Sequence, residues 1–183
     1  NVLRWTITNN GCTSTDEVTI DNDIPEIADA GPDQNLCLNT TTLAGNSAGT
    51  GTGLWSIVSG SGTFVDPTDE TTDVNNLGKG VNVFRWTISE NGCSTFDEVA
   101  ITNNLPTAPL AGTDQTICAD NTTLNANTPT VGTGEWSVLV GTGTFADATS
   151  ANTTITGLSQ GINTFRWTIT NNGCSLTDDI TIT

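Results

Sequence analysis

The sequence contains no histidine, tyrosine or methionine, and only four of its 183 residues are lysine or arginine. The absence of histidine removes the side chain that most often acts as a general base or metal ligand near neutral pH. Twenty acidic residues give a net charge of −16, which disfavours contact with nucleic acid or an anionic membrane surface. No apolar run is long enough to cross a membrane as a helix. We therefore predict that the chain is not an enzyme, does not bind nucleic acid and does not insert into a membrane.

What the sequence does contain is a tandem repeat with a period of about 81 residues. Residues 23–102 align with residues 104–183 without a gap, and 37 of the 80 aligned positions are identical. Residues 1–22 repeat the closing part of the same unit. We predict a C-terminal hairpin of a preceding, truncated module at 1–22 and two complete modules at 23–103 and 104–183. Because the first unit is partial, we expect the natural protein to extend upstream.

Short strand signals separated by turn residues run through each unit. About seven such strands in a module rich in Thr, Gly, Asn and Ser favour an antiparallel β-sandwich. The links between modules are short and contain proline, which predicts modules arranged end to end in a stiff rod. The fold class is therefore all-β, with tandem Ig-like sandwiches. The clearest strand signals in the first complete module are residues 40–45, 54–58, 62–66, 71–77, 82–89 and 96–102.

Large apolar side chains alternate with polar ones in the predicted strands. Phe84, Trp86 and Ile88 occupy every second position, so we expect them to face the core. Trp55 and Ile57 predict a second inward row, on the facing sheet. The two tryptophans should then meet across the sandwich and dominate its core. The second module carries the same pattern at Phe165, Trp167, Ile169, Trp136 and Val138.

An Asn-Gly dipeptide lies between the last two predicted strands of every unit, and it is a strong signal for a tight β-hairpin. The resulting register places an arginine opposite an acidic residue on the outer face, as a weak ion pair. Four recurring aspartates are candidates to accept backbone hydrogen bonds. The pairs are Arg4 with Glu17, Arg85 with Glu98, and Arg166 with Asp179, and the aspartates are Asp33, Asp114, Asp97 and Asp178.

The five cysteines follow the repeat. The sequence separation between Cys37 and Cys93 is the same as that between Cys118 and Cys174. We predict one disulfide within each complete module, Cys37–Cys93 and Cys118–Cys174, with the partner of Cys12 upstream of the chain. Metal binding is the alternative, although two cysteines per module without histidine make a poor zinc site. Disulfides would indicate an oxidising, extracellular location.

The acidic residues suggest one candidate metal site. Asp21 and Asp23 lie at the first link, where calcium could stiffen neighbouring modules through carboxylate oxygens. The second link has Thr102 and Asn104 at the equivalent positions, so the charge is not repeated. We therefore predict no obligatory cofactor and keep calcium at Asp21 and Asp23 as a minor hypothesis.

Four motifs recur in the same order in both modules: AGxDQxxC (30–37), GTGxWS (51–56), GxGTFxD (60–66) and FRWTIxxNGC (84–93). Together they resemble the Ig-like or PKD-like repeats of large surface adhesins of the Bacteroidota, including the SprB-type adhesins of gliding motility. The resemblance implies type IX secretion, a location at the cell surface and a role in filaments that attach to a surface. It supplies no catalytic residues.

Two functional hypotheses follow. The first is a structural segment, the stalk of an extracellular adhesin or surface filament that serves attachment or gliding. Its partners would be neighbouring modules, surface polysaccharide or other filament chains. The alternative is a glycan-binding or surface-binding sandwich that acts through threonine-rich outer faces.

Overall fold

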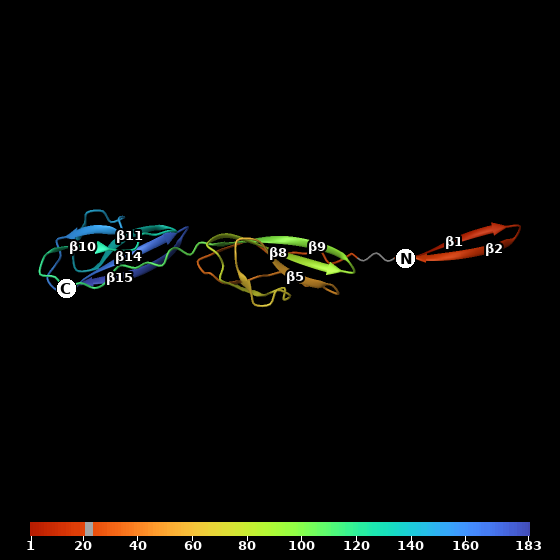
Figure 1. Cartoon of the computed structure of the whole chain (residues 1–183), viewed down its shortest axis with the longest axis horizontal. Coiled ribbons are helices and arrows are strands. Elements are labelled where there is room, and N and C mark those ends of the chain that lie inside the picture. The colour runs from red at the N-terminus through yellow and green to blue at the C-terminus, as the bar shows by residue number, and fades with distance from the viewer. Residues whose placement is uncertain (21–23) are drawn as a thin grey trace.

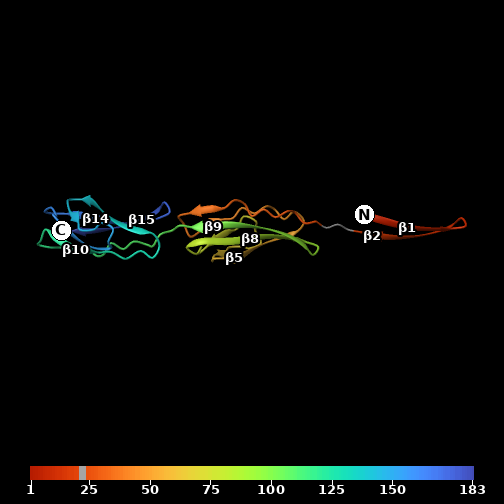
Figure 2. The ribbon, with the colours of Figure 1, turned by 90° about the horizontal axis from the view of Figure 1, so that it is seen from above.

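A computed structural model describes residues 1–20 and 24–183. This part of the chain forms strands, turns and irregular segments only, and contains no helix that could span a membrane. A two-stranded hairpin is followed by two β-sandwiches that lie end to end along one axis (Figures 1 and 2). The all-β architecture of tandem sandwiches predicted from the repeat is confirmed.

The first sandwich has two sheets. Its strands are β3 (Gln34–Leu36), β4 (Thr41–Thr42), β5 (Thr52–Ser59), β6 (Thr63–Phe64), β7 (Asp73–Asn75), β8 (Gly80–Glu90) and β9 (Cys93–Asn103). One sheet has the order β3-β9-β8-β5 and the other the order β4-β7-β6. All pairs are antiparallel except β3 with β9, which run parallel.

The second sandwich repeats this arrangement. Its strands are β10 (Asn121–Asn125), β11 (Thr133–Val140), β12 (Thr144–Phe145), β13 (Asn152–Thr156), β14 (Asn163–Asn171) and β15 (Cys174–Ile182). The sheets have the orders β11-β14-β15 and β10-β13-β12. The counterpart of β3 is a single parallel bridge between Gln115 and Ile182.

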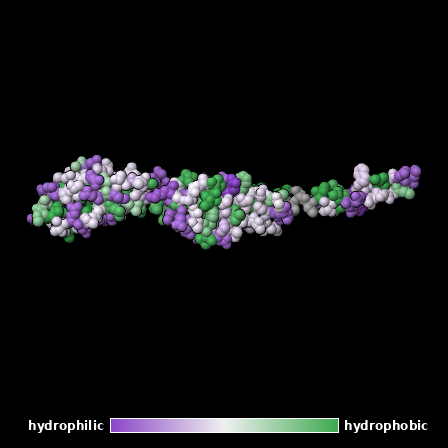
Figure 3. All heavy atoms as spheres, in the orientation of Figure 1, coloured by the Kyte–Doolittle hydropathy of each residue, from purple (hydrophilic) through white to green (hydrophobic). Residues whose placement is uncertain are grey.

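The N-terminal hairpin consists of β1 (Val2–Asn9) and β2 (Cys12–Thr19). Every residue of both strands is exposed, including Trp5, which is 71% exposed. Figure 3 shows apolar side chains at the surface of this hairpin. The same face of the later hairpins is buried in a sandwich, so Trp5 differs from the other four tryptophans.

The two sandwiches have separate hydrophobic cores. In the first, Phe84, Trp86 and Ile88 are almost completely buried. Trp55 is buried against Trp86, with ring centroids 5.0 Å apart. The second core repeats this pair in Trp136 and Trp167, at 5.1 Å, and also buries Phe165 and Ile169.

The tryptophan pairs do not meet across the sandwich, as the sequence pattern had suggested. Trp55 lies directly opposite Trp86 in the register of β5 and β8, so the two are neighbours in one sheet. Ile57 shares that face opposite Phe84, yet it is 45% exposed. The predicted burial of Ile57 is therefore wrong, because β5 is the edge strand of its sheet and a bulge follows Ile57. Val138 differs in the same way, at 39% exposed.

The recurring aspartates accept backbone hydrogen bonds, as expected. Asp97 Oδ2 accepts from the backbone N–H of Ala30 at 2.8 Å, and Asp33 Oδ1 accepts from that of Ala100 at 2.8 Å. These bonds attach the lead-in segment, residues 28–37 around β3, to β9, where a polar group without a partner would destabilise the edge. Asp178 and Asp114 make the same two bonds in the second sandwich.

The cross-strand ion pairs are also confirmed. Arg85 bonds to Glu98, and Arg166 to Asp179 through two parallel hydrogen bonds of 2.7 and 2.9 Å. Arg4 and Glu17 form the same pair in the hairpin. All three pairs are solvent-exposed, so each contributes at most about 1 kcal/mol to stability.

Asp179 should make the stability of the second sandwich pH-dependent. The hydrogen bonds from Arg166 hold the pKa of Asp179 below its ordinary value. A lowered pKa stabilises the fold at pH values above the ordinary aspartate pKa, and this contribution is lost as the pH falls through the lowered value. We expect the Asp179→Asn variant to be less stable than the parent at pH 7 by about 1 kcal/mol or less. Urea unfolding at pH 7 and at pH 2 measures this, and an equal deficit at both pH values would contradict it.

Candidate functional site: the junction between the sandwiches

The junction is where the structure departs most from the sequence-based prediction. Cys37 of the first sandwich forms a disulfide with Cys174 of the second, 137 residues later, with the two Cα atoms 5.3 Å apart. The predicted bonds Cys37–Cys93 and Cys118–Cys174 are therefore wrong. The disulfide joins the two sandwiches and does not close a loop within either of them.

Strand geometry explains why the predicted pairing fails. Leu36, next to Cys37, lies opposite Asn103 at the end of β9, whereas Cys93 begins that strand. Ten residue steps of an extended strand cover roughly 33 Å. Disulfide formation requires Cα atoms within about 7 Å of each other. Cys37 and Cys93 are thus at opposite ends of the first sandwich.

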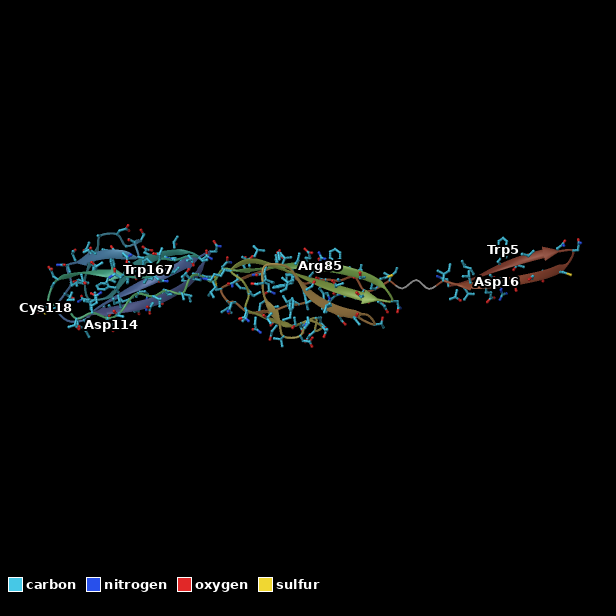
Figure 4. All side chains as sticks on the ribbon, viewed as in Figure 1. Trp5, Asp16, Arg85, Asp114, Cys118 and Trp167 are labelled. Atoms are coloured by element: carbon cyan, nitrogen blue, oxygen red, sulfur yellow. A yellow bond between two sulfur atoms is a disulfide. The ribbon has the colours of Figure 1, made fainter. Side chains whose placement is uncertain are left out.

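The two cysteines of the second sandwich also lie at its opposite ends. The backbone N–H of Ile117 bonds to the carbonyl of Thr183 at 2.8 Å, which places Cys118 at the far end of β15 from Cys174. Figure 4 shows Cys118 at the end of the second sandwich that points away from the first. Each sandwich therefore carries one cysteine at each end.

Two asparagines of the hairpin tip complete the junction. Asn171 Nδ2 donates to the backbone carbonyl of Asn104 at 3.1 Å, and Asn172 Nδ2 donates to the side-chain oxygen of Asn104 at 3.0 Å. The backbone N–H of Asn104 bonds in turn to the carbonyl of Leu36 at 2.8 Å. Asn104 and Cys174 are 7% and 3% exposed. The linker residue thus contacts both sandwiches at once.

The linker itself is held against the first sandwich. Asn103, the last residue of β9 before the linker, is buried, and its Nδ2 donates to the carbonyl of Leu77 at 3.0 Å. Lys79 Nζ donates to the carbonyl of Pro106 at 3.0 Å. Pro106 has a fixed φ angle and is buried, so it limits the directions in which the second sandwich can leave the first. Backbone, disulfide and hydrogen bonds together fix the relative position of the two sandwiches.

Within residues 1–20 and 24–183, the other predicted site residues do not converge on a second site. Cys12, Cys93 and Cys118 are exposed free thiols. Asp21 and Asp23, the candidate calcium ligands, lie outside the described residues. Among residues 1–20 and 24–183, no three Cys, Asp or Glu side chains lie close enough to bind a metal ion together.

Sequence reasoning missed the junction, although the sequence carries a signal for it. The separation between Cys37 and Cys174 exceeds that between Cys37 and Cys93 by one whole repeat, so the inter-module pairing fits the cysteine spacing as well as the pairing within a module. The hairpin turn identifies Cys93 and Cys174 as tip residues, and the lead-in residues follow β9 in the parallel direction. The two possible cysteine pairings are distinguished only by the direction and register in which β3 pairs with β9, which the cysteine spacing does not give.

Comparison with known proteins supports the fold. No family model matches the chain, and the search of curated proteins found no match. The insect immune protein hemolin aligns with 99% of this chain at 13% identity and a TM-score of 0.52. The chain spans 55% of hemolin.

Two further structures have lower scores. A titin fragment of three Ig domains, I67–I69, aligns with all of this chain and 73% of its own length, at 10% identity and a TM-score of 0.49. Domains 3–5 of Drosophila OTK align with 99% of this chain and 69% of their own length, at 12% identity and a TM-score of 0.42. At 13% identity the similarity to hemolin concerns the fold alone.

Proposed function

We propose that this chain is a tension-bearing segment of the stalk of an extracellular adhesin or surface filament, with residues 23–103 and 104–183 as its repeating units. The observation that carries the proposal is the doubly covalent junction. A single flexible linker would be enough to keep two independent binding modules on one chain. A disulfide beside the linker is useful where the orientation of neighbouring modules has to be maintained under load.

The two covalent links act together because they lie on different strands. The backbone enters the second sandwich through Asn104, while the disulfide attaches Cys37 to the tip of the β14–β15 hairpin. Two separate attachment points restrict bending and twisting more than one does. The apolar cores are separate, so the stiffness of the rod depends on this junction.

The proposal extends to the location of the protein and its role at the cell surface. A disulfide is stable in an oxidising environment, which supports an extracellular location. The motif resemblance adds a Bacteroidota surface adhesin of the SprB type, exported by type IX secretion and active in attachment or gliding. Neighbouring modules are the first partners, and surface polysaccharide is a further one. Calcium bound by Asp21 and Asp23 remains part of the hypothesis.

Residual dipolar couplings test the rod directly. In the oxidised protein, couplings from both sandwiches should fit one alignment tensor, because the junction holds them as one body. In a Cys37→Ser variant we expect two tensors of different magnitude, since the linker alone permits independent motion. A Cys118→Ser variant removes an exposed thiol away from the junction and is the matched control. Two distinct tensors in the oxidised parent would contradict the proposal.

The alternative function, glycan binding by the outer faces, has one supporting observation. Phe96 lies on an outer face, is 60% exposed, and carries the Arg85 guanidinium 4.3 Å from its ring centroid. An exposed aromatic ring of this kind can stack on a sugar. The second module has Thr177 at the equivalent position, so the feature is not repeated. Selective binding on a glycan array that a Phe96→Ala variant loses would favour this alternative over the stalk.

A further inference from the structure

A hollow lies on the second sandwich beside β11, which is the edge strand of its sheet. Its volume is about 570 Å³, within the range of known ligand sites. The hollow borders the junction, because its residue Thr170 precedes Asn171, which bonds to Asn104. Both modules that meet at this junction are part of the chain, so the hollow stays open after they have docked.

Four side chains form a polar array in the hollow. Thr133 lies opposite Thr170, and Glu135 lies opposite Thr168, in the register of β11 and β14. Opposite residues of neighbouring strands have Cβ atoms about 5 Å apart, and residues two apart along one strand are separated by about 7 Å. Three hydroxyls and one carboxylate are therefore spread over an area comparable to a sugar ring.

Two loops contribute further lining residues. Pro129 lies in the loop before β11, and Thr149 lies in the loop between β12 and β13. The Thr149 hydroxyl donates to Asp147 Oδ1 at 2.7 Å, and its backbone N–H donates to the same oxygen at 2.8 Å. These bonds fix the position of Thr149 and leave its hydroxyl oxygen free to accept a hydrogen bond from a ligand.

The loops beside this hollow are held less tightly than their counterparts in the first sandwich. There, both buried indoles donate to loop carbonyls, that of Trp86 to the carbonyl of Asn46 at 3.0 Å. The equivalent indole N–H groups of Trp136 and Trp167 are buried and have no partner among the residues that the structure describes. The equivalent hollow of the first sandwich has a volume of about 360 Å³. The wider hollow of the second sandwich thus goes with the loss of these two bonds.

The lining determines which ligands fit. The described residues around the hollow include one carboxylate, no lysine or arginine, and no aromatic side chain. With a net charge of −16 on the chain, phosphate, sulfate and uronate groups are disfavoured. Threonine hydroxyls donate and accept hydrogen bonds, and the Glu135 carboxylate accepts them. This combination suits an uncharged ligand with several hydroxyl groups.

We propose that the hollow of the second sandwich binds a neutral saccharide. Glu135 accepts hydrogen bonds from sugar hydroxyls, while Thr133, Thr149 and Thr168 exchange hydrogen bonds with neighbouring ones. The first sandwich has Leu54 at the position of Glu135, so the site belongs to the second sandwich.

The inference rests on the saccharide partner of the proposed function and gives it a location. It does not depend on the rigid junction, which the residual dipolar couplings test separately. Saccharide binding and the stalk role can therefore fail independently of each other.

Titration of the ¹⁵N-labelled full chain with neutral trisaccharides tests the proposal. The probes are maltotriose, cellotriose, mannotriose and triacetylchitotriose, with trigalacturonic acid as the anionic comparison and the glucosamine trimer as the cationic one. We expect at least one neutral probe to give saturable shifts at the amides of Gly134 and Thr168. The indole N–H of Trp167 should shift too, because its ring packs against Gly134, whereas the indole signal of Trp5 should not move.

The variants locate the site. Glu135→Leu introduces the residue of the first sandwich and should weaken binding about tenfold or more, because it removes hydrogen bonds to a charged group. Thr168→Val should weaken it about fivefold. Thr164→Val, on the same face of β14 but outside the hollow, is the matched control and should bind like the parent. Unchanged amide dispersion shows that each variant is folded.

Several results would overturn the proposal. The first is the absence of saturable shifts with every neutral probe. The second is binding of the anionic or the cationic trimer alone, which would show attraction of charge and not recognition of hydroxyls. The third is an affinity that Glu135→Leu and Thr168→Val leave unchanged. Loss of binding in Phe96→Ala would instead place the saccharide on the first sandwich.

Discussion

Pulled from its two ends, the oxidised chain should extend by about 480 Å less than the reduced chain. The bond between Cys37 and Cys174 removes 137 residue steps from the loaded path, and each step adds about 3.5 Å to an extended chain. Tension then runs from the N-terminus to Cys37, across the disulfide, and on to the C-terminus. Most of both sandwiches lies outside this path and cannot contribute unfolding steps.

Single-molecule force spectroscopy with handles at both termini measures this difference. Serine at positions 12, 93 and 118 prevents disulfide exchange and leaves only the native bond. The same protein with Cys37→Ser should show two sandwich unfolding events under oxidising conditions, as the reduced parent does. Disulfides within each module would instead leave two unfolding events and reduce the chain length released in each of them by the same amount. That result would contradict the inter-module bond.

A single methyl group at position 134 should destabilise the second sandwich by about 1–3 kcal/mol, the usual effect of overpacking a dense core. Gly134 lies in β11 beneath the indole of Trp167, and a Cβ atom there would be 2.1 Å from Trp167 Cζ2. Trp167 is fully buried and packs on Trp136. Its ring cannot move away without disturbing the whole core, so the methyl group has no low-energy position.

Calorimetry of Gly134→Ala tests this effect. For a module of this size, each kcal/mol corresponds to a fall in Tm of about 4–8 °C. The neighbouring Glu135→Ala substitution is the control, because Glu135 is exposed on the other face of the strand. Gly53→Ala should act in the same way on the first sandwich, where the new Cβ would be 2.2 Å from Trp86. A Gly134→Ala Tm equal to that of Glu135→Ala would refute this account of the core.

Much of the fold follows from local sequence signals. Alternation identified Phe84, Trp86 and Ile88 as inward-facing residues, and the Asn-Gly turns fixed the hairpin register that pairs Arg166 with Asp179. These signals depend on residues that are close in the sequence, where the pleat and the turn determine which residues meet.

Features that depend on long-range register could not be predicted in this way. Alternation shows that Trp55 faces inward but not that β5 pairs with β8, so the tryptophans were assigned to opposite sheets. Cysteine spacing likewise cannot distinguish a bond within a module from a bond between modules, because the two separations differ by one whole repeat. The decisive fact is the parallel pairing of β3 with β9, which carries Cys37 to the end of the sandwich opposite Cys93.

Tryptic mapping of the unreduced protein tests the junction most directly. Cleavage after Arg4, Lys79, Arg85 and Arg166 separates the cysteines into residues 5–79, 86–166 and 167–183. In a Cys12→Ser background, the Cys37–Cys174 bond joins peptide 5–79 to peptide 167–183 and leaves peptide 86–166 unlinked. Peptide 86–166 bound to both of the others would instead show the two bonds within modules and contradict the covalent junction.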